Sequence, residues 1–278
     1  MTTVGVVTGA GRGMGLECAR RMATMVGTLL LVDLDGQTAR DAAEELSSSL
    51  GAAVEPFVLD ITDREGLTRL AARVAELGTL RAVAHVAGIS PTMADWRRII
   101  EVDLVGTALL AEALRPLATA GTAFVYFSSM APTIAGVVAD PVLDAVLDEP
   151  LHPDLLDRIQ AALGAQAEHP GAAYVWAKYG VRRFAQHEAI RLGPVGARAC
   201  SVSPGIIDTP QGRQESEHNS SMAAMVDRTP LGRTGRADEV AAAVAFALSD
   251  EASFLSGVDL LVDGGVCAAT RLDAGMER

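Results

Sequence analysis

The chain has 278 residues, of which 49% are hydrophobic and 21% charged, with 27 glycines and 12 prolines. This is an ordinary globular composition, and it excludes a disordered chain, a collagen-like repeat and a disulfide-stapled miniprotein. The formal net charge of −12 repels phosphate backbones and anionic lipids, so we expect neither nucleic acid nor a membrane as a partner.

The three cysteines, Cys18, Cys200 and Cys267, are far apart in the chain and form no CxxC pair. Buried thiols in a reducing compartment are the simplest interpretation. No positively charged leader precedes the first apolar run, and no apolar run reaches the roughly 20 residues that a membrane-spanning helix requires. The sequence therefore predicts a cytoplasmic protein, and no metal site is expected.

Short apolar segments alternate with helical segments along the chain, which predicts a parallel sheet with helices on both faces. The apolar segments are rich in Val, Leu, Ile and Ala and scarcely alternate with polar residues, as expected for strands buried on both faces. We expect one doubly wound, Rossmann-type α/β domain over residues 1–278. Its strands are predicted at residues 4–8, 28–32, 54–58, 82–86, 123–128, 197–202 and 259–262, and its main helices at 16–24, 38–50, 64–77, 94–117, 175–192 and 237–248.

Two stretches do not fit the alternation. Residues 130–173 contain five prolines, several acids and a helical pattern over 155–163, and residues 210–228 are polar before a short segment with methionines. Loops of this length in a compact domain are often lids or binding segments. We predict that the first is an insertion and the second a substrate loop, each forming a lid or wall of the substrate site. A disordered surface insertion is the alternative.

The first strand runs directly into a glycine-rich segment, TGAGRGMG at residues 8–15, and a helix follows it. Glycines allow a tight turn and close approach to a pyrophosphate, which is favoured by the free N–H groups and dipole of a helix N-terminus. The spacing is GxxxGxG rather than the common GxGxxG. Its place between a strand and a helix predicts a dinucleotide site that includes Gly9, Arg12, Gly13, Met14 and Gly15.

Asp33 ends the second strand, 18 residues after Gly15. An acid near this separation can hydrogen-bond the ribose hydroxyls of NAD, and its charge repels the additional phosphate of NADP. Arg12 favours NADP instead, because a cation in the glycine loop could meet that phosphate. No Arg or Lys follows Asp33 before Arg40, so we predict NAD as the cofactor.

Tyr174 and Lys178 form a YxxxK pair, which places a phenol and an ammonium on one face of a helix. An unperturbed phenol titrates near ~10. We expect the lysine, helped by an oxidised nicotinamide, to lower the Tyr174 pKa so that the phenol exchanges a proton with an alcohol or ketone. The preceding strand ends in Ser128 and Ser129, whose hydroxyls can polarise the same substrate oxygen. A helix face with an extended lysine is the alternative interpretation of the pair.

Taken together, TGxxxGxG, the acid after the second strand, the serine after the fifth, YxxxK and a PGxIxT segment resemble the short-chain dehydrogenase/reductase family over nearly the whole chain. The resemblance implies that Ser129 orients the substrate oxygen, Tyr174 is the general acid and base, and Lys178 also holds the nicotinamide ribose. It further implies that Asp103 occupies the position of a catalytic asparagine. The cofactor contacts that it implies are Gly9, Gly13, Gly15, Asp33, Asp60, Ile61, Ala87, Gly88, Tyr174, Lys178, Pro204, Gly205, Ile207 and Thr209.

The chain departs from the family pattern at three places. The family's Asn-Asn-Ala-Gly turn reads His-Val-Ala-Gly at residues 85–88. A buried, hydrogen-bonded core residue is a simpler role for His85 than a chemical one. Asp103 replaces the asparagine, and its charge could either pair with Lys178 or weaken the effect of Lys178 on Tyr174. The 45 residues from Ser129 to Tyr174 exceed the usual dozen or so, as in some hydroxysteroid dehydrogenases of the family.

These features predict an NAD-dependent oxidoreductase that transfers a hydride between nicotinamide and a secondary alcohol or ketone, with a bulky alicyclic or steroid-like alcohol as one candidate substrate. Family resemblance favours a homo-oligomer, either a tetramer or a dimer. An NAD-binding regulatory or scaffolding protein with little turnover is the main alternative. A sugar epimerase or dehydratase also uses YxxxK, but its relatives have a GxxGxxG loop and a larger C-terminal part.

Overall fold

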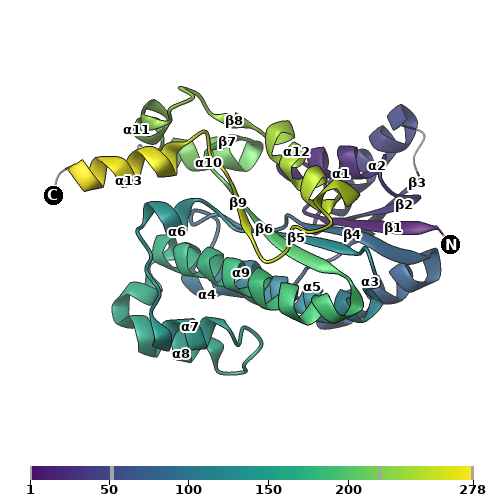
Figure 1. Cartoon of the computed structure of the whole chain (residues 1–278), viewed down its shortest axis with the longest axis horizontal. Coiled ribbons are helices and arrows are strands. Elements are labelled where there is room, and N and C mark those ends of the chain that lie inside the picture. Colours follow the sequence, from purple (N-terminus) through teal and green to yellow (C-terminus); the bar gives the residue numbers. More distant parts are fainter. Residues whose placement is uncertain (1, 51–52, 219–220, 277–278) are drawn as a thin grey trace.

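The computed structural model describes residues 2–50, 53–218 and 221–276, and in these residues a seven-stranded parallel sheet forms the centre of the molecule (Figure 1). The sheet order is β3-β2-β1-β4-β5-β6-β9, which confirms the predicted doubly wound fold. The strands are β1 (Thr3–Thr8), β2 (Thr28–Asp33), β3 (Ala53–Val58), β4 (Thr79–His85), β5 (Ala123–Phe127), β6 (Arg198–Pro204) and β9 (Asp259–Val262).

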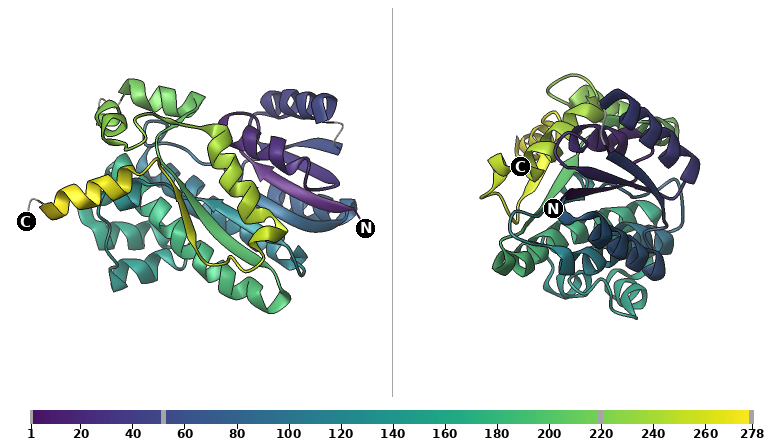
Figure 2. Two further views of the ribbon diagram at one scale, coloured as in Figure 1. Left: turned by 45° about the horizontal axis from the view of Figure 1, so that its top comes forward. Right: turned by 90° about the vertical axis from the view of Figure 1, so that its right-hand side faces the viewer.

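Helices cover both faces of this sheet (Figure 2). On one face, α1 (Gly13–Met22), α2 (Gly36–Leu50) and α12 (Ala237–Leu248) close over a core that includes Met22 and Leu46. On the other face, α3 (Arg64–Leu77), α5 (Gly106–Leu114) and α9 (Pro170–Leu192) close over a second core around Phe124 and Tyr126. None of the described helices has the length and apolar character needed to cross a bilayer.

The strand order reverses between β1 and β4, which carry the glycine loop and the turn after His85 at their carboxyl ends. Ligands of open parallel sheets bind at the carboxyl ends of the strands at such a reversal. The fold thus brings the glycine loop beside the turn that follows His85.

The helix expected over residues 94–117 is interrupted. It consists of α4 (Trp96–Ile100), a π-helical turn η1 (Glu101–Val105), α5 and a short 3-10 turn η2 (Arg115–Leu117). A π turn inside an α-helix shifts the side chains that follow it and is frequent at functional sites. This turn carries Asp103, which is buried.

Most of the segment 130–173 packs against α9 away from the two cavities described below, but its first residues and Gly171 line the second of them. They form α6 (Ala131–Ile134), α7 (Pro141–Leu147), α8 (Leu155–Leu163) and the 3-10 turn η3 (Gly164–Glu168), with α8 as predicted (Figure 1). Arg183 of α9 binds Asp144 at 2.9 Å and Asp148 at 2.6 Å. Residues 136–170 line neither of the two cavities at the carboxyl ends of the strands. The two ends of the insertion thus contribute to a cavity wall, and the role of the insertion as a lid or wall of a substrate site stays a prediction.

A second cover lies over the carboxyl ends of the strands and includes elements that the sequence did not predict. The short strands β7 (Ile207–Asp208) and β8 (Gly235–Arg236) pair beside α10 (Pro210–His218), α11 (Ser221–Arg228) and α13 (Val266–Met276). Met222 of α11 joins Met130, Ile206, Val266 and Cys267 in a small separate core. Within residues 210–228, residues 219–220 lie outside the described part of the chain. In the described remainder, Gln211, Gly212, Glu215, Met222 and Met225 line the second of the two cavities described below, and the role of this segment as a substrate loop stays a prediction.

Candidate active site

The glycine loop has the geometry of a pyrophosphate cradle. Gly9 and Gly13 have φ values of 64° and 57°, in the left-handed region that favours glycine. A Cβ on Gly15 would lie 1.9 Å from the Gly9 carbonyl oxygen, so a larger residue there would displace the loop. α1 starts at Gly13 and has no acid in its first turn, so its N–H groups are open to an anion.

Asp33 lies in the same cavity and also organises the loop. Its carboxylate accepts hydrogen bonds from the Gly11 N–H at 2.8 Å and the Asp35 N–H at 3.0 Å. Asp60 lines the cavity further along, where Arg98 donates to it at 2.8 Å. Hydrogen bonds from Thr62 and the positive charge of Arg98 outweigh partial burial and hold the Asp60 pKa below its usual value. The cavity has a volume of about 360 Å³. The free N–H groups of its glycine loop and the carboxylate of Asp33 at the end of β2 fit a dinucleotide.

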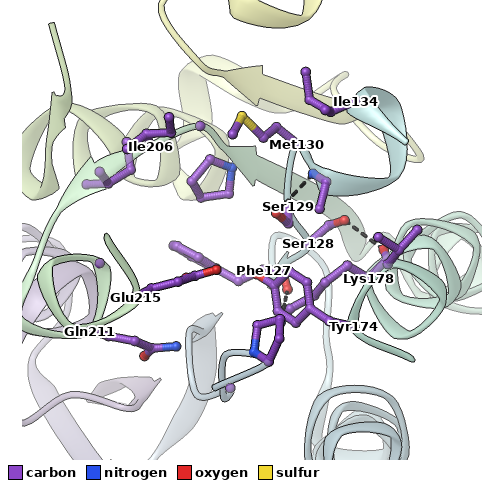
Figure 3. Close-up of a pocket in the computed structure, with 18 of the residues that line it drawn as sticks. Phe127, Ser128, Ser129, Met130, Ile134, Tyr174, Lys178, Ile206, Gln211 and Glu215 are labelled. Carbon is purple, nitrogen blue, oxygen red and sulfur yellow. Dashed lines mark hydrogen bonds between the residues drawn. The ribbon is translucent and has the colours of Figure 1, made fainter. Parts of the chain in front are cut away.

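A second cavity of about 360 Å³ adjoins the first and contains the predicted catalytic side chains. Ser129, Tyr174 and Lys178 line it together (Figure 3). The Ser129 Oγ accepts the Ala131 N–H at 3.1 Å, and the Ser129 hydroxyl also hydrogen-bonds Tyr174. The Lys178 Nζ donates to the Phe127 carbonyl at 3.2 Å and lies 5.6 Å from the centre of the Tyr174 ring.

All the cofactor contacts that the sequence predicted line one or both of these cavities. The two cavities share a common wall, so a ligand atom in one can reach the other. The shared residues are Met14, Val86, Gly88, Ile89, Thr209 and Gln211.

The expected lowering of the Tyr174 pKa is not produced by the protein's own charges. Burial raises this pKa above its ordinary value, the negative charges of Asp103 and Glu215 raise it further, and hydrogen bonding by Ser129 opposes them. The protein alone thus favours the neutral phenol. The Lys178 ammonium lies 3.6 Å from the Asp103 carboxylate.

Asp103 lines neither cavity but lies directly behind them. Its Oδ1 accepts the Ile89 N–H at 2.9 Å, and its Oδ2 lies 3.6 Å from the Lys178 Nζ. That Oδ2 atom is buried and has no hydrogen-bond partner among the described residues. Burial raises the Asp103 pKa, although Lys178 and the Ile89 N–H act against it. Gly88 leaves room for the pair, since a Cβ there would lie 2.9 Å from Oδ1 and 3.0 Å from Nζ.

His85 is a core histidine with both ring nitrogens hydrogen-bonded. Its Nδ1 lies 2.7 Å from the Thr8 Oγ1, and its Nε2 lies 2.9 Å from the Thr107 Oγ1. The Thr107 hydroxyl donates its proton to the Asp103 carbonyl, so it must accept from the His85 Nε2–H. Burial, followed by the charge of Lys178, lowers the His85 pKa to about 3 and keeps the ring neutral. His85 thus ties β4 to Thr107 in the first turn of α5, whose hydroxyl in turn bonds the Asp103 carbonyl of the π turn, which is the core role that the simpler interpretation predicted.

Arg182, Gln211 and Glu215 are site residues that the sequence did not single out. Arg182 lies four residues after Lys178 and so continues the helix face that carries YxxxK. It donates to the Ser129 carbonyl, to the Thr133 hydroxyl at 2.8 Å and to the Ser128 hydroxyl at 3.2 Å, and so fixes the strand end that presents Ser129. Gln211 and Glu215 line the cavity from α10. Their i, i+4 spacing was the one available sequence signal.

The comparison with known families gives a match to the family described as "Enoyl-(Acyl carrier protein) reductase" over residues 9–141 and 159–267. The unmatched residues 142–158 fall within the segment that packs on α9. Together with the site, this match shows that the chain belongs to the short-chain dehydrogenase/reductase family. Proteins of this family are oxidoreductases that use a nicotinamide cofactor.

Individual relatives align along almost the whole chain. A trans-4-hydroxycyclohexanecarboxylate dehydrogenase of Sinomonas cyclohexanicum is 31% identical over 97% of this chain and 94% of its own length. A cyclopentanol dehydrogenase of a Comamonas strain is 30% identical, covering 95% and 96% of the two chains. A short-chain type dehydrogenase/reductase from Mycobacterium ulcerans, known as a solved structure, has a TM-score of 0.76 at 25% identity, covering 96% and 90%.

Proposed function

We propose that this protein is an NAD-dependent dehydrogenase that interconverts a secondary alcohol, most simply an alicyclic or steroid-like one, and its ketone. The observation that carries the proposal is the convergence of Ser129, Tyr174 and Lys178 in a largely apolar cavity that adjoins the glycine loop. The names of the two curated relatives, which describe dehydrogenases of ring alcohols, support the same substrate class.

In this mechanism, Tyr174 and Ser129 act on the substrate oxygen. The Ser129 O–H donates to that oxygen and orients it, because its own Oγ is already held by the Ala131 N–H. Tyr174 removes the hydroxyl proton during oxidation and returns it during reduction. The bound nicotinamide supplies the hydride acceptor or donor.

Lys178 and Arg182 hold this arrangement in place. Lys178 is buried, donates to the Phe127 carbonyl, and provides positive charge near the Tyr174 ring and a donor toward the nicotinamide ribose. Arg182 donates a hydrogen bond to the Ser129 carbonyl and so fixes the backbone at that residue. Proton transfer by a positioned side chain typically contributes 10²–10⁴-fold to the rate.

Asp33 favours NAD over NADP, because its carboxylate lines the cofactor cavity and would repel the additional phosphate of NADP. No Arg or Lys follows Asp33 before Arg40 that could bind this phosphate.

We place the protein in a reducing compartment, the cytoplasm, because the described cysteines Cys18, Cys200 and Cys267 are all buried free thiols. We also propose a homo-oligomer, which is supported by large apolar side chains exposed on the surface, including Phe254 at 104% and Ile190 at 74%.

The test is to record nicotinamide absorbance with NAD and then NADP while supplying cyclopentanol, cyclohexanol and larger ring alcohols. Turnover with NAD that is lost in Tyr174→Phe supports the proposal. Binding of NAD without turnover of any alcohol would favour a regulatory NAD-binding protein instead. The raised Tyr174 pKa, which disfavours the phenolate, is the observation that makes this second candidate worth testing.

A further inference from the structure

The wall of the substrate cavity contains an acid that the proposed chemistry does not use. Glu215 and Gln211 lie one turn apart on α10 and are directed into the cavity, toward the side that carries Tyr174 and Ser129 (Figure 3). The rest of that wall is mostly apolar, with Met130, Ile134, Ala135, Ile206, Met222 and Met225 among its residues.

Glu215 has no protein partner in the part of the chain that the structure describes. It makes no ion pair and accepts no hydrogen bond there, although neighbouring acids do, as Asp208 does with Arg213. Partial burial, without a compensating donor, raises the Glu215 pKa above its ordinary value. A half-buried carboxylate among apolar side chains is stabilised by any donor that enters the cavity.

The charges around the cavity are unfavourable for an anion. Lys178 is the cation among its lining residues, and its ammonium is already directed to the Phe127 carbonyl and the Asp103 carboxylate. Glu215 adds a negative charge on the opposite wall, close enough to act on Tyr174. A substrate carboxylate in this cavity would therefore face like charge at reduced dielectric.

We propose that Glu215 is a specificity-determining residue that selects uncharged ring alcohols carrying a second hydrogen-bond donor and rejects those carrying a carboxylate. This inference rests on the proposed alcohol dehydrogenase activity. The Glu215 carboxylate accepts a hydrogen bond from a second hydroxyl of the substrate, while the apolar side chains contact the ring. Gln211 offers an amide on the same helix face, so the far end of the substrate meets one charged and one neutral group.

The experiment compares kcat/KM for three alcohols that share one ring: cyclohexanol, cyclohexane-1,4-diol and trans-4-hydroxycyclohexanecarboxylate, the last being the substrate named for one relative. We expect the wild type to prefer the diol over cyclohexanol and cyclohexanol over the carboxylate. Glu215→Gln removes the charge at nearly constant size. It should raise the carboxylate-to-cyclohexanol ratio about 10-fold and lower the diol-to-cyclohexanol ratio.

Glu251→Gln is the matched control, because Glu251 is exposed, lines neither cavity, and loses the same charge. Its ratios should equal those of the wild type. If Glu215→Gln folds poorly, as judged by circular dichroism, Glu215→Ala provides the same comparison. Turnover with unchanged ratios in the Glu215 variants would overturn this inference alone. Absence of turnover with all three alcohols would overturn the proposed function and, with it, this inference.

Discussion

The Asp103 carboxylate lies 3.6 Å from the Lys178 ammonium, and both side chains are buried where Lys178 lines the second cavity. The carboxylate is held by the Ile89 N–H on one oxygen, and the other oxygen faces the lysine without a hydrogen bond among the described residues. The same negative charge raises the Tyr174 pKa. Both effects anticipated from the sequence are therefore present, since Asp103 pairs with Lys178 and also opposes ionisation of the tyrosine.

Asp103→Asn should move the pH dependence of alcohol oxidation. In the proposed mechanism, oxidation uses the Tyr174 phenolate, so we expect its rate to rise with pH as that phenol ionises. Removal of a negative charge lowers the Tyr174 pKa, and the rising limb of kcat/KM against pH should shift by about one unit toward lower pH. The amide oxygen can still accept the Ile89 N–H. A limb that stays in place or moves toward higher pH would contradict the effect of Asp103 on Tyr174.

Tyr174→Phe should lower kcat by roughly 10²–10⁴-fold while the cofactor dissociation constant changes little, because the ring is kept and only the ionisable hydroxyl is lost. The pH-dependent limb should disappear in the same variant. Tyr179→Phe is the control, since the Tyr179 hydroxyl donates to Asp144 at 3.0 Å and lines neither cavity. A Tyr174→Phe enzyme with wild-type kcat would refute the proposed general base.

Asp33→Asn should reduce the preference for NAD over NADP. We expect the wild type to bind NAD at least ~10-fold more tightly, a difference of about 1.4 kcal/mol. The amide keeps an acceptor for the Gly11 N–H, so the loop is retained while the charge that repels the additional phosphate is removed. Calorimetric dissociation constants for both cofactors check this. Equal wild-type constants would sink the NAD assignment and point to Arg12, exposed in the same cavity, as a phosphate ligand.

Arg183→Met should destabilise the fold by about 1–3 kcal/mol and leave the KM for a large alcohol unchanged. The guanidinium joins α9 to the insertion through Asp144 and Asp148, and its loss leaves two partly buried carboxylates without their partner. Arg158→Met, which removes a single exposed pair with Glu149, should cost less than about 1 kcal/mol. Urea unfolding measures both. A rise in KM for large alcohols in Arg183→Met would instead indicate that the insertion takes part in substrate binding as a lid.

The strands were predictable because each is a short, continuous apolar run. Such runs are typical of strands in a parallel sheet that is covered by helices on both faces. The glycine loop, Asp33, Tyr174 and Lys178 were predictable because their spacing fixes their geometry on one strand end or one helix turn. Ser129 followed from its place at the end of β5.

The position of the insertion was not predictable, because it is decided by tertiary ion pairs. Asp144 and Asp148 read as surface acids in the sequence, and only the packed helices bring Arg183 between them. The π turn at Asp103 could not be predicted either, because an apolar pattern that indicates a helix does not distinguish an α-helical turn from a π-helical turn. The sign of the Tyr174 pKa shift depends on burial, which no spacing of residues reveals.

The small core of Met130, Ile206, Met222, Val266 and Cys267 joins α11 and α13 to the segments that follow β5 and β6, apart from the two large cores on the faces of the sheet. Segments with few buried apolar contacts open at lower free energy than the body of a domain. Amide hydrogens of α11 and α13 should therefore exchange together and earlier than those of β1 and β4. We therefore expect α11, which lines the second cavity, and α13 to open as one unit, so that a substitution in α13 that loosens this core also changes access to the cavity.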